Sequence, residues 1–135
     1  MVRKERRRAL REALDDLERY RIAYDRATFR ASRDAQRLVS HALYVAVQSC
    51  LDEAQEACRT RKLDAGDRYR ECFVTLGKAG ALDPSLAGRL SDWASFRNVL
   101  AHFYPVLDIE RVYDALSELE DLAAFERWIL AEDRG

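Results

Sequence analysis

Four side chains near position 100 have the residue types and the spacing of a site that handles phosphate. They are Arg97, Asn98, His102 and Tyr104, and on a helix of about 100° per residue they share one polar arc around the small Ala101. A guanidinium donates paired hydrogen bonds to a phosphate, an imidazole exchanges a proton near neutral pH, and an amide or a phenol orients the group between them. Such an arc suits metal-independent RNA cleavage, in which a 2′-hydroxyl attacks the adjacent phosphorus, although it is also typical of solvated helix surface.

In that chemistry His102 is the general acid or base, and Arg97 stabilises charge on the phosphoryl oxygens. Asp52, on an earlier helix, either orients His102, as carboxylates often orient an imidazole, or is an ordinary polar position near the end of its helix. The other histidine, His41, lies in an apolar stretch. We therefore expect it to be a buried, hydrogen-bonded residue rather than a second catalytic group.

No metal ion or cofactor is expected. The cysteines, Cys50, Cys58 and Cys72, contain no C-x-x-C pair, and with two histidines in the whole chain they do not form a four-ligand zinc spacing. We interpret them as small core or surface residues that remain thiols in a reducing compartment.

The elements that must position these residues are predicted to be helices. Alanine and leucine are abundant, whereas valine, isoleucine, threonine, glycine and proline are scarce, which favours helix over sheet. The helix that carries the polar arc begins after Asp83, an N-cap followed by Pro84 at the first helical position. It ends near Phe103, because Pro105 disfavours helical geometry at the residue before it.

Four further helices are expected from apolar residues that recur every three or four positions. The second helix in chain order is apolar over so wide an arc that it belongs in the middle of a bundle. The short third one is expected to stop at Gly77 or Gly80. The predicted fold class is all-α, an antiparallel four- to five-helix bundle in one domain, residues 1–135. The expected bounds are about 3–26, 32–59, 68–78 and 108 to near the C-terminus, with Ser32 and Asp108 as N-caps.

The chain has 135 residues and a formal net charge of −1, and no run is long and apolar enough to span a membrane. It begins without an apolar secretion signal, so a cytoplasmic protein is expected. Basic residues are in excess over residues 1–40 and acidic residues over 106–135. The basic region could bind a polyanion or an acidic partner, but we favour the interpretation that the acidic last helix packs beside the first helix and complements its charge.

The segment from Phe96 to Tyr104 resembles the signature of the HEPN superfamily, an arginine with a polar residue, three further residues and a histidine. The tyrosine two positions later makes the motif Arg-x4-His-x-Tyr, which is similar to that of the HepT-like toxins of HepT–MntA toxin–antitoxin systems. The resemblance extends over about residues 32–130. It implies a HEPN-like helical bundle that dimerises so that two motif helices face one cleft.

The resemblance also implies an endoribonuclease, acting on mRNA or tRNA, that is neutralised by an MntA-like nucleotidyltransferase antitoxin. Arg97 and His102 take the catalytic positions, Asn98 is the polar residue that supports them, and Tyr104 takes the place of the tyrosine that the antitoxin adenylylates. The alternative is a non-catalytic HEPN module that binds a partner nucleotidyltransferase or a nucleotide. A bundle with a purely structural role is a third possibility.

Overall fold

The computed structural model describes residues 2–66, 69–101 and 108–134, and every regular element in these ranges is helical. The all-α fold class is therefore confirmed. No described helix is long and apolar enough to cross a membrane. The elements are α1 (Val2–Ala23), α2 (Arg26–Ala31), α3 (Arg33–Thr60), α4 (Tyr69–Lys78), α5 (Pro84–Ala101), α6 (Ile109–Ala115), the 3₁₀ turn η1 (Leu116–Glu118) and α7 (Glu120–Arg134).

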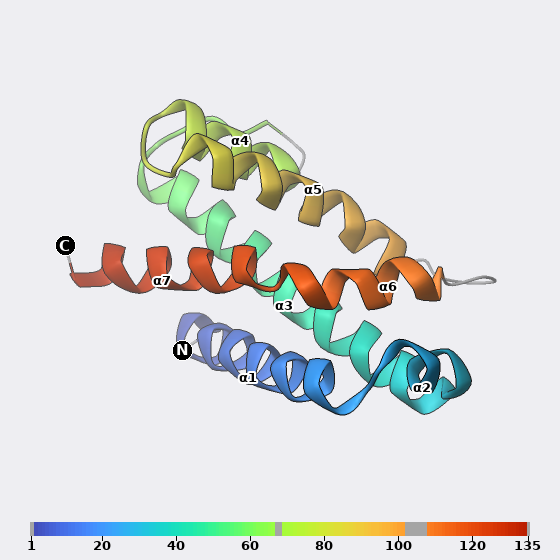
Figure 1. Ribbon diagram of the computed structural model, residues 1–135. Coiled ribbons are helices and arrows are strands. Elements are labelled where there is room, and N and C mark those ends of the chain that lie inside the picture. Colours follow the sequence, from blue (N-terminus) through green and yellow to red (C-terminus); the bar gives the residue numbers. More distant parts are fainter. Residues whose placement is uncertain (1, 67–68, 102–107, 135) are drawn as a thin grey trace.

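Helix α3 is the central element, as its wide apolar arc predicts. Helices α1, α4, α5 and α7 all pack against it, and Figure 1 shows it crossing the molecule from α2 to α4. Its buried residues lie on most of its circumference, so the side that remains polar is narrow. The core on this helix includes Val39, Leu43, Ala46, Val47 and Cys50.

The predicted N-caps have the expected geometry. The Ser32 hydroxyl accepts a hydrogen bond from the Ala35 amide, and the Asp83 carboxylate accepts one from the Leu86 amide. The Asp108 side chain caps α6 in the same way. The predicted end of the first helix at Arg26 is wrong, because α1 ends at Ala23 and Asp25 caps the short α2, a helix that the apolar pattern did not reveal.

The last predicted helix is divided in the structure into α6, η1 and α7. Around the division four large apolar residues are buried at three-residue steps, a spacing that a 3₁₀ turn places on one side of the helix. The 3₁₀ turn at η1 is therefore compatible with the burial of all four residues in the core. These residues are Leu116, Leu119, Leu122 and Phe125.

Helices α4 and α5 approach each other closely at Gly77. A Cβ at this position would lie 2.9 Å from the Cβ of Ala87, so only glycine fits without a shift of the neighbouring helix. Gly77 lies inside α4, which ends at Lys78. Gly80 follows in the left-handed conformation, with φ of 76°. The tight contact fixes the start of α5, the helix that carries the motif.

Several arginines of α1 are paired with carboxylates of α3 and α7. Arg6 and Arg7 both donate to the buried Glu53, and Arg7 also pairs with Asp133. Arg11 donates to Glu126 at 2.6 Å. The interpretation that the acidic last helix complements the basic first helix is therefore confirmed. These arginines hold the bundle together and are not a free cationic surface.

Candidate active site

Helix α5 carries Arg97 on the side that faces α3. Trp93, Phe96 and Leu100 of the same helix are buried, which fixes the rotation of α5 about its axis. Arg97 lies beside this apolar face and is partly exposed, whereas Asn98 is exposed. The core of α5 therefore presents the first two motif residues at the boundary between α3 and solvent.

Among the described residues, three neighbours hold the guanidinium of Arg97. Its Nε donates to Oε1 of Gln48 at 2.9 Å, and one Nη donates to Oδ1 of Asn98 at 3.2 Å. Its Cζ lies 5.7 Å from the centre of the Tyr44 ring, within the range of a cation–π contact. An arginine fixed in this way loses less side-chain entropy when it binds a phosphate than one that is free in solvent.

The hydrogen bonds continue from Arg97 to Asp52. Gln48 accepts from Arg97 through Oε1 and donates through Nε2 to Oδ1 of Asp52 at 2.9 Å. The Gln48 amide is thereby oriented through both its oxygen and its nitrogen. The negative charge of the Asp52 carboxylate strengthens the hydrogen bond that the amide nitrogen donates. The structure thus brings the predicted residues Arg97, Asn98 and Asp52 into one network.

Two other motif residues, His102 and Tyr104, lie outside the described residues. The expectation that Asp52 orients His102, and the predicted helix end near Phe103, stay predictions for the same reason. The expectation for His41 is wrong, because its side chain is exposed on α3 rather than buried. Its helical position places it on the narrow polar side of α3, which the apolar neighbours in the sequence concealed.

Sequence reasoning missed Gln48 and Tyr44. Both are partly exposed and belong to the polar side of α3, with Asp52 one turn after Gln48. The signal was present, since Tyr44, Gln48 and Asp52 recur at four-residue steps within an otherwise apolar helix. What the sequence lacked was the rotation of α5 that brings Arg97 onto this row.

The three cysteines are buried thiols, so the core alternative of the prediction is confirmed. Burial is the main cause that raises the pKa of Cys50, and it also raises that of Cys72, to about 11. Raised values keep both groups protonated at neutral pH, which makes them poor nucleophiles. Neither of these thiols is therefore a candidate catalytic group.

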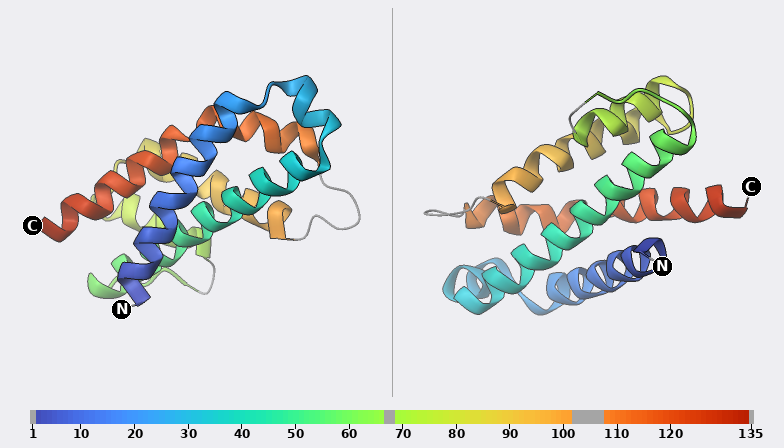
Figure 2. Two further views of the ribbon diagram at one scale, coloured as in Figure 1. Left: turned by 90° about the horizontal axis from the view of Figure 1, so that it is seen from below. Right: turned by 180° about the vertical axis from the view of Figure 1, so that it is seen from behind.

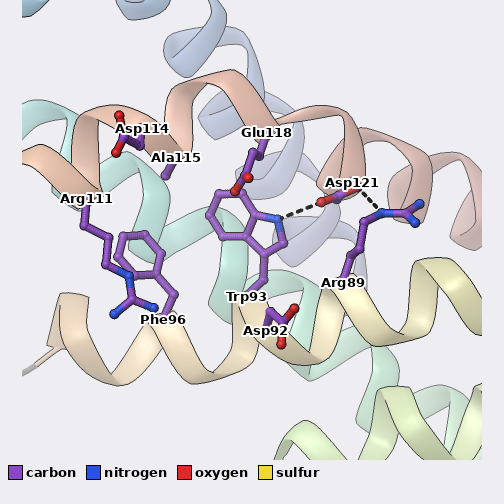
Figure 3. Close-up of a pocket in the computed structure, with 9 residues that line it drawn as sticks. All are labelled: Arg89, Asp92, Trp93, Phe96, Arg111, Asp114, Ala115, Glu118 and Asp121. Carbon is purple, nitrogen blue, oxygen red and sulfur yellow. Dashed lines mark hydrogen bonds and ion pairs between the residues drawn. The ribbon is translucent and has the colours of Figure 1, made fainter.

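A half-open cavity of about 200 Å³ lies between α5 and the segment from α6 to α7 (Figure 3). Asp121 accepts from Arg89 at 2.8 Å and from the Trp93 indole at 3.3 Å, and the Arg111 guanidinium stacks over Phe96. Carboxylates outnumber guanidinium groups around this cavity, so a polyanion is disfavoured there. The lining residues are Arg89, Asp92, Trp93, Phe96, Arg111, Asp114, Ala115, Glu118 and Asp121.

Comparisons with known proteins place the chain in a family. The profile of the family described as Ribonuclease HepT-like matches residues 10–129, a range that contains the whole Arg-x4-His-x-Tyr motif. No curated protein sequence matches the chain.

Three solved structures have the same fold. A chain of the tri-AMPylated Shewanella oneidensis HEPN toxin in complex with MNT antitoxin is 21% identical, with a TM-score of 0.84 over 96% of this chain and 97% of that one. A toxin–antitoxin with AMP-PNP gives 19% identity and a TM-score of 0.81 over 95% and 97% of the two chains. A tyrosine-to-alanine mutant of the toxin–antitoxin MntA–HpeT gives 20% and 0.85 over 97% and 99%.

Proposed function

The chain belongs to the Ribonuclease HepT-like family, and we propose that it is the toxin of a toxin–antitoxin pair, an endoribonuclease that cleaves RNA without a metal ion. The observation that supports this most directly is the fixed guanidinium of Arg97, which Gln48 and Asn98 hold at the edge of α3. The similar fold of toxins solved with their antitoxins supports the toxin role.

The proposed reaction is an internal transfer at phosphorus. The 2′-oxygen forms a bond to the adjacent phosphorus while its proton passes to a base, and the bond to the 5′-oxygen breaks as that oxygen takes up a proton. His102 supplies the acid–base chemistry, and Arg97 stabilises the charge that grows on the phosphoryl oxygens. One histidine does not serve both ends of the reaction at once, so the second histidine comes from another copy of the chain in a symmetric dimer.

The test is incubation of the purified protein with RNA in the presence of a chelator. We expect cleavage by the natural sequence, and a loss of at least ~100-fold for His102→Ala and for Arg97→Ala. Arg134→Ala is the control, since this arginine is exposed and has no ion pair among the described residues. Undiminished cleavage by a folded His102→Ala protein would reject the proposed chemistry. Partner binding without cleavage by the natural sequence would support the non-catalytic module instead.

We also propose that Tyr104 is the site of control by an MntA-like nucleotidyltransferase. Its phenol oxygen attacks the α-phosphorus of ATP, pyrophosphate leaves, and the added AMP competes with RNA phosphates for Arg97 through its own charge. A tri-AMPylated toxin among the structures of similar fold supports this choice of modification.

With such a nucleotidyltransferase, ATP and magnesium, mass spectrometry should find one or more AMP masses on Tyr104, and cleavage should stop. Tyr104→Phe should keep at least part of its cleavage and escape modification, because the phenol controls the site rather than performing the reaction. Modification at another residue, or a Tyr104→Phe protein silenced as fully as the natural one by the same reaction, would contradict this role.

A further inference from the structure

Three exposed side chains form a row along the N-terminal half of α3. Arg33, Arg37 and His41 follow one another at four-residue steps, so each lies about one helical turn, or about 6 Å, beyond the last. All three are exposed, in contrast to the buried residues that occupy most of this helix. We refer to Arg33, Arg37 and His41 as the α3 basic stripe.

The two arginines of the stripe have no ion pair among the described residues. In contrast, the neighbouring Arg26 and Arg30 are both paired with Glu110 of α6, and Arg7 and Arg11 of α1 pair with α3 and α7. Asp34 is adjacent in sequence and still makes no ion pair with them. Their charge is therefore available to a ligand, at no cost of breaking an existing pair.

The stripe leads directly to the candidate active site. On α3 it continues into Tyr44 and Gln48, the two residues that contact Arg97. Figures 1 and 2 show α5 running back along α3 from the α4 end toward α2, so the stripe extends past the point where Arg97 touches α3. From Arg33 to Gln48 the helix rises about 22 Å, the length of a few nucleotides of an extended strand.

We propose that the α3 basic stripe binds the single-stranded RNA that flanks the cleaved phosphodiester, with Arg33 and Arg37 on phosphates and His41 donating to the same backbone. The proposal rests on the ribonuclease function proposed above and assigns it a path for the substrate. A row one residue wide fits one strand rather than a duplex. Contacts to the phosphate backbone position a strand without reading its sequence.

Other surfaces suit the strand less well. Carboxylates outnumber guanidinium groups around the cavity beside Trp93, and Arg6 and Arg7 at the start of α1 are paired with Glu53 and Asp133. A contact between two copies of the stripe is also disfavoured, since a two-fold axis through it would bring unpaired arginines against one another.

The test compares two double variants with matched spacing and charge change. Arg33→Gln/Arg37→Gln removes both arginines of the stripe, and Lys4→Gln/Arg8→Gln is the control, because these two residues on α1 are also exposed and have no ion pair among the described residues. The probe is a short single-stranded 2′-O-methyl RNA, whose blocked 2′-oxygen prevents cleavage. Its affinity is measured over a range of salt concentrations for the full chain.

Loss of two phosphate contacts should reduce the slope of log affinity against log salt by about 1.4, at about 0.7 per contact with a single strand. The affinity of the stripe variant should fall by roughly an order of magnitude near physiological salt, while the control matches the natural sequence. With cleavable RNA, the stripe variant should have a raised KM and a kcat close to that of the natural protein, because Arg97 and its partners are intact.

If the natural protein cleaves RNA but the stripe variant and the control have equal slopes of log affinity against log salt, the α3 basic stripe does not bind the RNA. That result would overturn this proposal and leave the proposed ribonuclease function unaffected. A natural protein that neither binds nor cleaves RNA would overturn both proposals. Light scattering supplies a further outcome. A change of molecular mass in the stripe variant, with an unchanged salt slope, would assign the stripe to a contact between copies of the chain and reject the RNA path.

Discussion

Arg97 depends on a neighbour from another helix for its orientation. Gln48 is the one residue described here that accepts from the Arg97 Nε and at the same time donates to Asp52. Leucine at position 48 has a similar size but makes neither of these hydrogen bonds. The Arg97 guanidinium would keep Asn98 and the Tyr44 ring as neighbours but lose the hydrogen bond that orients its Nε. Catalytic groups that are less well oriented raise the activation free energy without changing the chemistry.

We expect Gln48→Leu to lower kcat by roughly tenfold, which corresponds to about 1.4 kcal/mol, with a smaller change in KM. Gln55→Leu on the exposed side of the same helix is the control and should leave both constants unchanged. A double-mutant cycle makes the test specific, because Gln48→Leu should have little further effect once Arg97 is alanine. Additive losses in the cycle would mean that Gln48 acts on something other than Arg97.

At the scale of single residues, the sequence predicted best what local geometry decides. Arg97 and Asn98 lie outside the buried face of α5, because Phe96 and Leu100, four residues apart, occupy that face. The pairing of Arg97 with Gln48 could not be predicted, since it depends on how α5 rests on α3. The expectation for His41 was wrong because its apolar sequence neighbours concealed its place on the narrow polar side of α3.

At the scale of elements, the buried carboxylate of Glu53 connects α3 to α1. The residue is 3% exposed, and its carboxylate accepts from Arg6 and Arg7. Glu53→Gln should lower the free energy of unfolding by about 2 kcal/mol, less than for a fully isolated buried pair, because Arg6 and Arg7 keep second carboxylates. Glu18→Gln, in an exposed pair with Arg21 on α1, should cost at most about 0.5 kcal/mol. Equal losses in urea unfolding would reject this account of the network.

The same carboxylate predicts how stability depends on pH. Burial acts to raise the pKa of Glu53, but hydrogen bonds from Arg7 and Arg6 outweigh it, so the value lies below the ordinary 4.5. A lowered folded-state pKa gives stability that is complete above the unfolded pKa and is lost as pH falls through the folded one. The difference in unfolding free energy between the natural protein and Glu53→Gln should therefore be constant near neutral pH and shrink below about pH 4.5.

Glu110 does not disturb this comparison. Hydrogen bonds from Arg30 and Arg26 lower the pKa of Glu110 to about 2. Its protonation in acid therefore also lowers the free energy of unfolding. Because Glu110 is present in both proteins, its contribution cancels in the difference. If the difference in unfolding free energy between the natural protein and Glu53→Gln stays constant down to pH 2, the charge of Glu53 contributes nothing to stability.

Capping residues and the periodicity of apolar residues predicted most helices, because both signals come from residues in or next to each helix. Ser32, Asp83 and Asp108 begin α3, α5 and α6 as expected. The division at η1 was missed because an apolar residue every third position satisfies an α-helix and a 3₁₀ turn almost equally well over one turn. Leu119 and Leu122 beside the division are buried in the core, and this tertiary packing is not contained in the local sequence.

At the scale of the whole molecule, the proposed reaction requires more than one chain. A single copy supplies one His102 and one Arg97, whereas proton removal and proton donation occur on opposite sides of the phosphorus. A two-fold dimer that brings two motif helices together supplies both groups. Ala101 lies one turn after Arg97 and is small and partly exposed, which leaves room for a second helix to approach.

We therefore expect light scattering to give a mass twice the 15.6 kDa of one chain. Ala101→Trp should impair dimerisation and reduce cleavage while the circular dichroism of the helices is preserved, because the indole occupies the space that the second motif helix needs. Ala131→Trp on the exposed end of α7 is the control and should change neither mass nor cleavage. A monomer that cleaves RNA at full rate at every concentration would contradict the shared site, since each catalytic group would then have to act from a single chain.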